Sequence, residues 1–458
     1  MAGKAKAAAK PKVTAGQAAA TATASEAAMP LKGDSAWFVR DRFGMFIHWG
    51  TYAAGARHEW LKRNERMTDE RYQTYFEHFD PDLFDPEAWA RAARIAGMKY
   101  MVITAKHHEG FCLWDSRHTD YKAPNTPARR DLLHPVVDAF RAEGLRIGLY
   151  YSLLDWHHPD YPLDRCHPMW ENEEFKAKAK GRDIRKYQKY MRDQVTELLT
   201  EFGKIDYLFF DFSFANPDGK GRDDWDSPAL MKLCRTLQPQ ILLDNRLDLT
   251  DVPGGWDVMT PEEQMASAWP TYNGKKALWE TCQTLCGSWG YHRQPGYWKT
   301  VTQNVFLLID TVSKGGNLLL NVGPTARGEF NAPALASLSG IGEWMRQHGR
   351  SIYGCTQAPD DIPTPQDARL TWNPETKRLY VHILNWPLGT FALPGMAGRV
   401  KYAQLLHDAG EVTQVDAEQH AALAWMGPDH KAKRGTVLLK LPMQKPDVAV
   451  PVVELFLE

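Results

Sequence analysis

The chain has 458 residues with 55 basic and 56 acidic side chains, so its net charge of -1 is close to zero. A chain of this length usually exceeds one core, and we expect two folded domains. The charges are interspersed and create no large basic or acidic field, which argues against nucleic acid or a membrane surface as a partner. No apolar run approaches the roughly 18 residues of a membrane span.

The first thirty residues are rich in Ala and Lys and contain no Leu, Ile or Phe. They lack the apolar centre of a secretory leader, and we expect residues 1–33 to form a disordered tail. As given, the chain fits a cytoplasmic location; removal of an earlier leader would make it periplasmic or secreted. The six cysteines show no zinc or disulfide spacing and are expected to be structural or incidental thiols.

From residue 34 the sequence alternates between apolar and amphipathic segments. Residues 45–50 indicate a first strand, and five helix–strand units follow, with helices at 86–97, 133–144, 182–202, 227–237 and 300–313 and strands at 99–108, 145–152, 205–212, 240–246 and 315–323. Continuous apolar strands separated by helices predict a parallel sheet that is covered on both faces. No Gly-rich phosphate loop follows the first strand, so the pattern favours a (β/α)8-like, TIM-type catalytic barrel over residues 34–354.

Beyond residue 353 the texture changes to short alternating runs, after a segment containing Pro and Asp at 358–367. These runs predict a C-terminal antiparallel β-sandwich over residues 355–458. Beside a catalytic barrel, such a sandwich usually serves packing or accessory ligand binding.

Polar side chains occur where the predicted barrel strands end. Because active sites of such barrels form at the carboxyl ends of the strands, these residues are candidates for one site. They are His48, His107, His108, Tyr150, Tyr151, Asp211, Arg246 and Asn321.

The segment YLFFDFSF, residues 207–214, places Asp211 among aromatic residues. An ionised carboxylate in apolar surroundings costs several kcal/mol unless it is paired or solvated. At the end of a barrel strand it suits a nucleophile or a base. The alternative is a structural Asp that caps a helix or pairs with Arg; Arg246, after the next strand, could hold it ionised.

Three histidines near two neighbouring strand ends also raise the question of a metal. His107 and His108 are adjacent, so on a strand they would point to opposite sides, and no Asp or Cys cluster completes a ligand set with His48. We therefore expect neutral imidazoles that form hydrogen bonds with hydroxyl groups.

If Asp211 is one of a pair of glycosidase carboxylates, a second must lie nearby. Retaining enzymes place the two groups roughly 5 to 5.5 Å apart. Candidates after the fourth strand are Asp257, Glu262, Glu263 and Glu280, and sequence position alone does not choose among them.

Several segments together resemble the α-L-fucosidases of glycoside hydrolase family 29. The likeness runs from about residue 37 to 353, and HHEGF, IHWG with a later EW, and NLLLNVGP occur in the family's order. It implies a retaining exo-glycosidase that releases terminal α-linked L-fucose and requires no metal or organic cofactor. Two positions depart from the common family pattern: Glu109 replaces an Asp, and Phe209 replaces a Trp.

The resemblance also implies a set of site residues. Asp211 is expected to be the nucleophile and Glu262 the acid/base, with Glu263 adjoining it as the alternative. The implied sugar-binding residues are His48, Glu59, Trp60, His107, His108, Tyr150, Arg246 and Trp289, and we expect the rings of Phe209, Trp60 and Trp289 to contact the 6-methyl group.

The expected partner is a fucosylated oligosaccharide or glycoconjugate, and the sequence is also compatible with a homo-oligomer. Three alternatives remain at this point: a retaining hydrolase of a related sugar such as α-L-galactose, a catalytically inactive fucose-binding protein, and a metal-dependent barrel hydrolase. The preferred fucosyl linkage is not fixed by the sequence.

Overall fold

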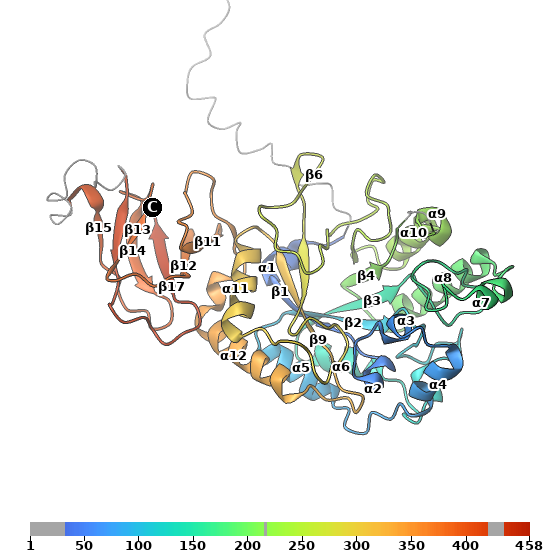
Figure 1. The fold of residues 1–458 in the computed structure, drawn as a ribbon. Coiled ribbons are helices and arrows are strands. Elements are labelled where there is room, and N and C mark those ends of the chain that lie inside the picture. Colours follow the sequence, from blue (N-terminus) through green and yellow to red (C-terminus); the bar gives the residue numbers. More distant parts are fainter. Residues whose placement is uncertain (1–32, 215–217, 420–434) are drawn as a thin grey trace, which may run out of the picture.

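A parallel sheet forms the centre of the larger part of the molecule (Figure 1). The computed structural model describes residues 33–214, 218–419 and 435–458. Seven strands pair in the order β5-β4-β3-β2-β1-β9-β8. Their bounds are β1 Phe43–Ile47, β2 Tyr100–Lys106, β3 Arg146–Ser152, β4 Tyr207–Asp211, β5 Leu242–Leu243, β8 Glu280–Thr284 and β9 Asn317–Val322.

An extended segment, residues 257–262, lies between the two edge strands of this sheet. Single parallel bridges join Asp244 to Val258, Met259 to Trp279 and Glu262 to Cys282. These bridges connect β5 to β8 around the remaining side of the barrel. The predicted TIM-like fold is confirmed, with seven regular strands and this irregular eighth position.

Strand β8 was not predicted, because its sequence ETCQT looks polar. All five residues are buried, and their polar groups find partners inside the protein. Glu280, for example, accepts hydrogen bonds from the hydroxyls of Tyr100 at 2.5 Å and Tyr207 at 3.1 Å. Polar residues can form a buried strand when their groups are hydrogen-bonded, so the sequence of such a strand shows no apolar run.

Helices cover the outside of the barrel, and a large apolar core fills the space between helices and sheet. Three of the five predicted helices begin at an N-cap side chain that accepts a backbone hydrogen bond. Asp85 accepts one from Ala88 N, Asp183 accepts one from Arg185 N, and Thr300 forms a capping box with Gln303. The longer helices are α5 Pro86–Ile95, α6 Leu133–Ala142, α8 Ile184–Thr200, α10 Ser227–Leu237, α11 Val301–Val312 and α12 Ala332–His348; the shorter ones are α1 Ala36–Asp41, α2 Tyr52–Gly55, α3 Leu61–Asn64, α4 Asp69–Glu77, α7 Glu173–Lys178 and α9 Arg222–Trp225. Within the described ranges, none of the helices is long and apolar enough to cross a bilayer.

Antiparallel strands follow from Thr356 onward and enclose a separate apolar core. One sheet has the order β10-β11-β12-β17-β14 and the other β13-β16-β15, as the sandwich prediction requires. The bounds are β10 Thr356–Gln357, β11 Ala368–Asn373, β12 Arg378–Ile383, β13 Thr390–Leu393, β14 Val400–Leu405, β15 Gln414–Asp416, β16 Val437–Lys440 and β17 Val452–Leu457, and a separate hairpin pairs β6 Thr271–Tyr272 with β7 Lys275–Lys276. The division at residues 354 and 355 stays a prediction, and the expected tail lies, except for Gly33, outside the described residues.

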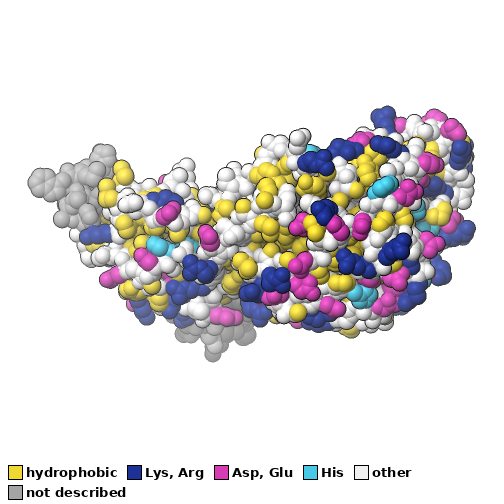
Figure 2. Space-filling model, turned by 90° about the horizontal axis from the view of Figure 1, so that it is seen from below, with side chains coloured by type: hydrophobic (Ala, Val, Ile, Leu, Met, Phe, Trp, Pro, Cys, Tyr) yellow, Lys and Arg dark blue, Asp and Glu magenta, His cyan; other side chains and the backbone are white. Residues whose placement is uncertain are grey.

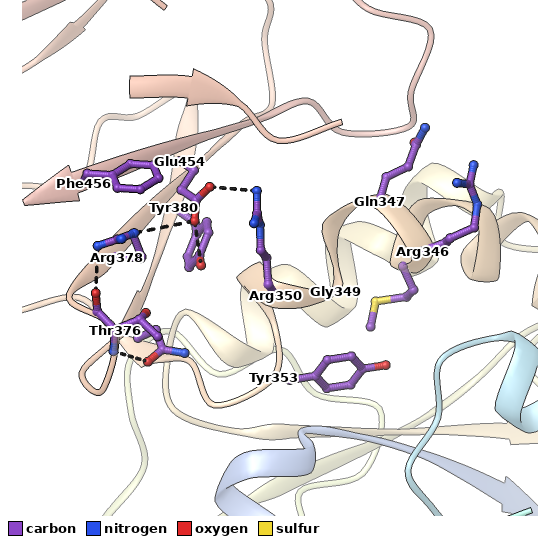
Figure 3. A pocket seen from close by; sticks show the side chains of 12 residues that line it. Arg346, Gln347, Gly349, Arg350, Tyr353, Thr376, Arg378, Tyr380, Glu454 and Phe456 are labelled. Atoms are coloured by element: carbon purple, nitrogen blue, oxygen red, sulfur yellow. Dashed lines mark hydrogen bonds and ion pairs between the residues drawn. The ribbon is translucent and has the colours of Figure 1, made fainter. Parts of the chain in front are cut away.

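The sandwich packs against α12 and the short 3-10 helix η2, Gly349–Ser351. Trp344 of α12 donates its indole hydrogen bond to Val450 O at 2.8 Å. Arg350 reaches across the groove between the two parts and contacts the buried carboxylate of Glu454 at 3.0 Å (Figure 3). These contacts fasten the sandwich to helices on the outside of the barrel.

Candidate active site

A pocket opens at the carboxyl ends of the barrel strands. The helices α2, α3 and α4 follow β1 and lie toward the lower right of Figure 1. Figure 2 shows the molecule from below, and hydrophobic side chains gather near the middle of that face. The pocket encloses about 320 Å³, including its open mouth. Its walls are Phe46, His48, Trp60, His107, His108, Tyr150, Phe209, Asp211, Phe212, Arg246, Glu262, Cys282 and Trp289.

Asp211, the last residue of β4, lies within this pocket with its charge compensated. Its Oδ1 accepts a hydrogen bond from Arg246 Nη1 at 2.6 Å, and its Oδ2 accepts one from the Tyr150 hydroxyl at 2.7 Å. Burial, and then the Asp211 charge, raise the pKa of Tyr150 well above its usual value, so this phenol stays a donor. Both carboxylate oxygens therefore have a hydrogen-bond partner, and the side chain is largely shielded from water.

Glu262 and Asp211 contact the same cation, the guanidinium of Arg246. Its Oε2 contacts the same Arg246 Nη1 at 3.1 Å, while Asp211 Oδ1 contacts it at 2.6 Å, so these two oxygens are at most the sum of those distances, 5.7 Å, apart. Loss of water, and secondarily the Asp211 charge, raise the pKa of Glu262, although Arg246 opposes the shift. The pocket thus holds one carboxylate paired with Arg246 and Tyr150, and a second whose pKa is shifted upward.

The other candidate carboxylates point elsewhere. Glu263 has a left-handed backbone, with φ of 49°, and its Oε1 accepts a hydrogen bond from the Thr284 hydroxyl at 2.7 Å. Asp257 contacts Arg235 at 2.6 Å and Gly33 N at 3.2 Å. Glu280, at the start of β8, lies at the opposite end of the barrel interior. Glu262 is therefore the member of this set that lines the pocket.

Arg246 is itself fixed by the segment that closes the barrel. Its Nε donates to the Thr260 hydroxyl at 3.1 Å and its Nη2 to Thr260 O at 3.0 Å. Asn245 Oδ1 in turn accepts hydrogen bonds from Thr260 N and its hydroxyl. The guanidinium therefore has a defined position between the two carboxylates.

The histidines form one cluster in the pocket. The expectation that His107 and His108 point to opposite sides was wrong, because β2 ends at Lys106 and both rings lie beyond the strand, with centroids 3.9 Å apart. Their adjacency in the wall does not produce a metal centre: within the part of the chain that the structure describes, no group of three or more His, Cys, Asp or Glu side chains is arranged to hold an ion.

Hydrogen bonds define the tautomers of two of these rings. Asn321 donates its amide to Trp289 O, so its Oδ1 accepts from His48 Nδ1 at 2.7 Å. Ser152 donates to Leu154 O and so accepts from His108 Nδ1 at 2.7 Å. Burial, and then the neighbouring His107, lower the pKa of both rings well below the usual value. Each is neutral and presents an Nε2 acceptor, and that of His108 lies 3.9 Å from Asp211.

Aromatic rings complete the walls, including two that the sequence analysis missed. Phe46 lies 5.3 Å from Phe209 and 5.9 Å from Trp289, between ring centroids. Phe212, directly after Asp211, has a φ of 75° and packs 5.3 Å from Trp60. The spacing of Phe46 two residues before His48 could have revealed it, since alternate strand residues share a face; the unusual backbone of Phe212 has no sequence signal.

Ten of the eleven site residues implied by the resemblance line the pocket, and Glu59 lies behind its wall; the strand-end candidates Tyr151 and Asn321 are not among the lining residues. The Glu59 carboxylate is fully buried, and its Oε2 accepts a hydrogen bond from Gly290 N at 2.8 Å, next to Trp289. Cys282 was missed because it belongs to the unrecognised strand β8.

Known proteins provide an independent comparison. The family model described as Alpha-L-fucosidase matches residues 8–350. The plasma alpha-L-fucosidase of Rattus norvegicus is 28% identical over 437 residues, which cover 89% of this chain and 87% of the relative. The tissue alpha-L-fucosidase of Homo sapiens is 28% identical over 382 residues, covering 77% and 76%.

Solved structures are similar over nearly the whole chain. Alpha-L-fucosidase isoenzyme 1 from Paenibacillus thiaminolyticus is 46% identical, has a TM-score of 0.85 and covers 93% of this chain and 98% of its own. An alpha-L-fucosidase of glycoside hydrolase family 29 from Bacteroides thetaiotaomicron, trapped as a covalent intermediate, is 25% identical with a TM-score of 0.78, covering 94% and 98%. With the family match spanning the barrel and its pocket, the chain belongs to the α-L-fucosidase family, glycoside hydrolase family 29.

Proposed function

We propose that this chain is a retaining exo-glycosidase that releases terminal α-linked L-fucose from glycans, with Asp211 as nucleophile and Glu262 as acid/base. The observation that carries the proposal is the contact of both carboxylates with Arg246 Nη1, which limits their nearest oxygens to 5.7 Å. Retaining glycosidases need about 5 to 5.5 Å between the two groups, whereas inverting ones need about 6.5 to 9.5 Å.

The reaction has two steps on these residues. Asp211 Oδ attacks the anomeric carbon while Glu262 transfers its proton to the departing glycosidic oxygen, which forms a fucosyl–aspartate ester. Glu262, now a carboxylate, removes a proton from water, and that water displaces Asp211 and regenerates the starting protonation states. The raised pKa of Glu262 suits its first role, because the acid must be protonated when substrate binds.

The remaining wall residues fit a small, partly apolar sugar. Neutral His48 and His108 each offer an acceptor nitrogen to a hydroxyl group. Phe46, Phe209 and Trp289 form a contiguous apolar surface against which the 6-methyl group of fucose can pack. A fucosylated oligosaccharide or glycoconjugate is the substrate class that this pocket favours.

The nucleophile is tested with Asp211→Gly and an aryl α-L-fucoside. We expect a loss of at least about 10³-fold in kcat, as for removal of a nucleophile that acts in both steps, with partial rescue by azide and formation of fucosyl azide. Glu263→Gly provides a matched control, because this carboxylate bonds Thr284 outside the pocket. Normal turnover by Asp211→Gly would disprove the assignment, and an inactive wild type that still binds L-fucose would favour a binding protein instead.

A further inference from the structure

Lys106, the last residue of β2, carries an ammonium group into the layer between the barrel sheet and α8. The residue is fully buried. A register irregularity between Thr104 and Lys106 in the pairing with β3 turns the side chain to this outer face. There Nζ contacts Asp155 Oδ2 at 3.0 Å and the Tyr187 hydroxyl at 3.1 Å, and it lies 4.4 Å from the ring centre of Tyr151.

Asp155 connects this ammonium to two turns at the pocket. It follows β3, and its other oxygen, Oδ1, accepts hydrogen bonds from His157 N at 3.0 Å and His158 N at 2.8 Å. The same oxygen would lie 2.3 Å from a Cβ at Gly110, whose φ is 86°. The turn after β2 therefore rests directly on this carboxylate, and only glycine fits at the contact.

The two turns meet again at the wall of the pocket. Trp156 N donates a hydrogen bond to His108 O at 2.8 Å. The Trp156 ring packs 5.5 Å from His108 and 5.3 Å from Trp60, between centroids. A displacement of Asp155 would therefore move two side chains that face the substrate.

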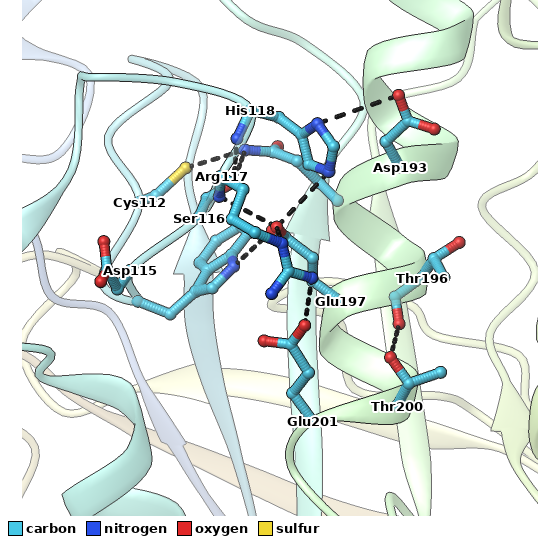
Figure 4. A network of polar contacts seen from close by, with 12 residues as sticks. Cys112, Asp115, Ser116, Arg117, His118, Asp193, Thr196, Glu197, Thr200 and Glu201 are labelled. Carbon is cyan, nitrogen blue, oxygen red and sulfur yellow. Dashed lines mark hydrogen bonds and ion pairs between the residues drawn. The ribbon is translucent and has the colours of Figure 1, made fainter.

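The more distant part of the loop after β2 has a separate anchor (Figure 4). The buried carboxylate of Glu197 on α8 accepts hydrogen bonds from Trp114 Nε1 and Arg117 N, each at 2.9 Å. The loop as a whole is thus attached to α8 without Lys106. What the Lys106–Asp155 contact adds is local, at the histidine turn.

We propose that Lys106 and Asp155 are positioning residues for the reaction: their buried ion pair holds His108 and, through Trp156, the Trp60 wall in the geometry that faces Asp211. This inference rests on the proposed function. A purely stabilising role is a poor explanation, because a well-packed apolar pair of similar volume often stabilises a protein as much as or more than a buried ion pair. Positioning gives a reason to keep the two charges.

The test compares Lys106→Met, Asp155→Asn and the double variant of the full chain. Each single variant leaves one buried charge without its partner and should lower the melting temperature, whereas the double variant removes both charges and should recover most of it. If the pair positions the wall, kcat/KM for an aryl α-L-fucoside falls about 10- to 100-fold in all three variants, including the double variant whose melting temperature has recovered.

Lys314→Met is the matched control. Lys314 contacts the buried carboxylate of Asp310, on α11, which also binds Arg369 far from the pocket. This variant should lower the melting temperature and keep wild-type kcat/KM. A double variant with wild-type kcat/KM, or an equal kinetic loss in Lys314→Met, would overturn the inference alone; a wild-type chain that turns over no fucoside would overturn the proposed function and this inference with it.

Discussion

Glu280 makes the stability of the barrel depend on pH in a way that can be calculated. Burial raises the pKa of this carboxyl to about 8 from its ordinary 4.5, against the hydrogen bonds from Tyr100 and Tyr207. The folded state thus binds the proton more tightly than the unfolded state. Below pH 4.5 both states are protonated, and between pH 4.5 and 8 the unfolded state alone loses its proton, so stability falls as pH rises.

The magnitude follows from the pKa difference. At about 1.36 kcal/mol per pKa unit, a shift from 4.5 to about 8 amounts to roughly 5 kcal/mol of unfolding free energy lost by pH 9, as an upper bound. Glu280→Gln keeps the shape and the acceptor oxygen but does not titrate. The stability of Glu280→Gln relative to the wild type should therefore grow by up to about 5 kcal/mol from pH 4.5 to pH 9.

Urea unfolding of both proteins at pH 5, 7 and 9 measures this difference, because the other titrating groups are common to both and cancel. Glu77→Gln, at an exposed position on α4, is the control for replacing a carboxyl group by an amide at the surface. A constant difference between Glu280→Gln and the wild type over this range would refute the reasoning.

Four further predictions concern catalysis. Glu262→Ala should slow the first step about 10²-fold or more on a natural fucosyl oligosaccharide, but only slightly on an aryl fucoside with an activated leaving group. Equal losses of rate on both substrates would shift the acid role elsewhere. Because Glu262 acts first as an acid, kcat/KM should decline as pH rises through its raised pKa, and a flat alkaline profile would contradict the role. Paired aryl glycosides should show α-L-galactoside turned over less efficiently than α-L-fucoside, by no more than about 10²-fold, since an apolar pocket rejects an added hydroxyl only weakly. Treatment with a chelator should leave turnover unchanged, and its loss would favour the metal-dependent alternative.

Much of the fold follows from local signals. The predicted strands at 145–152 and 205–212 closely match β3 and β4, because continuous apolar runs between helices are typical of parallel strands covered on both faces. The predicted strand at 240–246 shrinks to β5, Leu242–Leu243. Beyond it, Asn245 bonds Thr260 of the segment 257–262, and Arg246 contacts Asp211. Strand β8 was missed because Glu280, Thr281 and Thr284 form their hydrogen bonds with residues distant in sequence.

By itself, the sequence indicated the family through a resemblance, and it predicted that Asp211, Arg246 and the histidines lie at the ends of neighbouring strands, since parallel strands bring their carboxyl ends to one rim. Only the tertiary structure distinguished Glu262 from Glu263, because a left-handed backbone at Glu263 turns that side chain to Thr284 while Glu262 reaches Arg246. It also placed Glu59 behind the wall and joined His107 and His108 on one side. These outcomes depend on backbone direction and on contacts between residues far apart in the chain, which residue type and spacing do not encode.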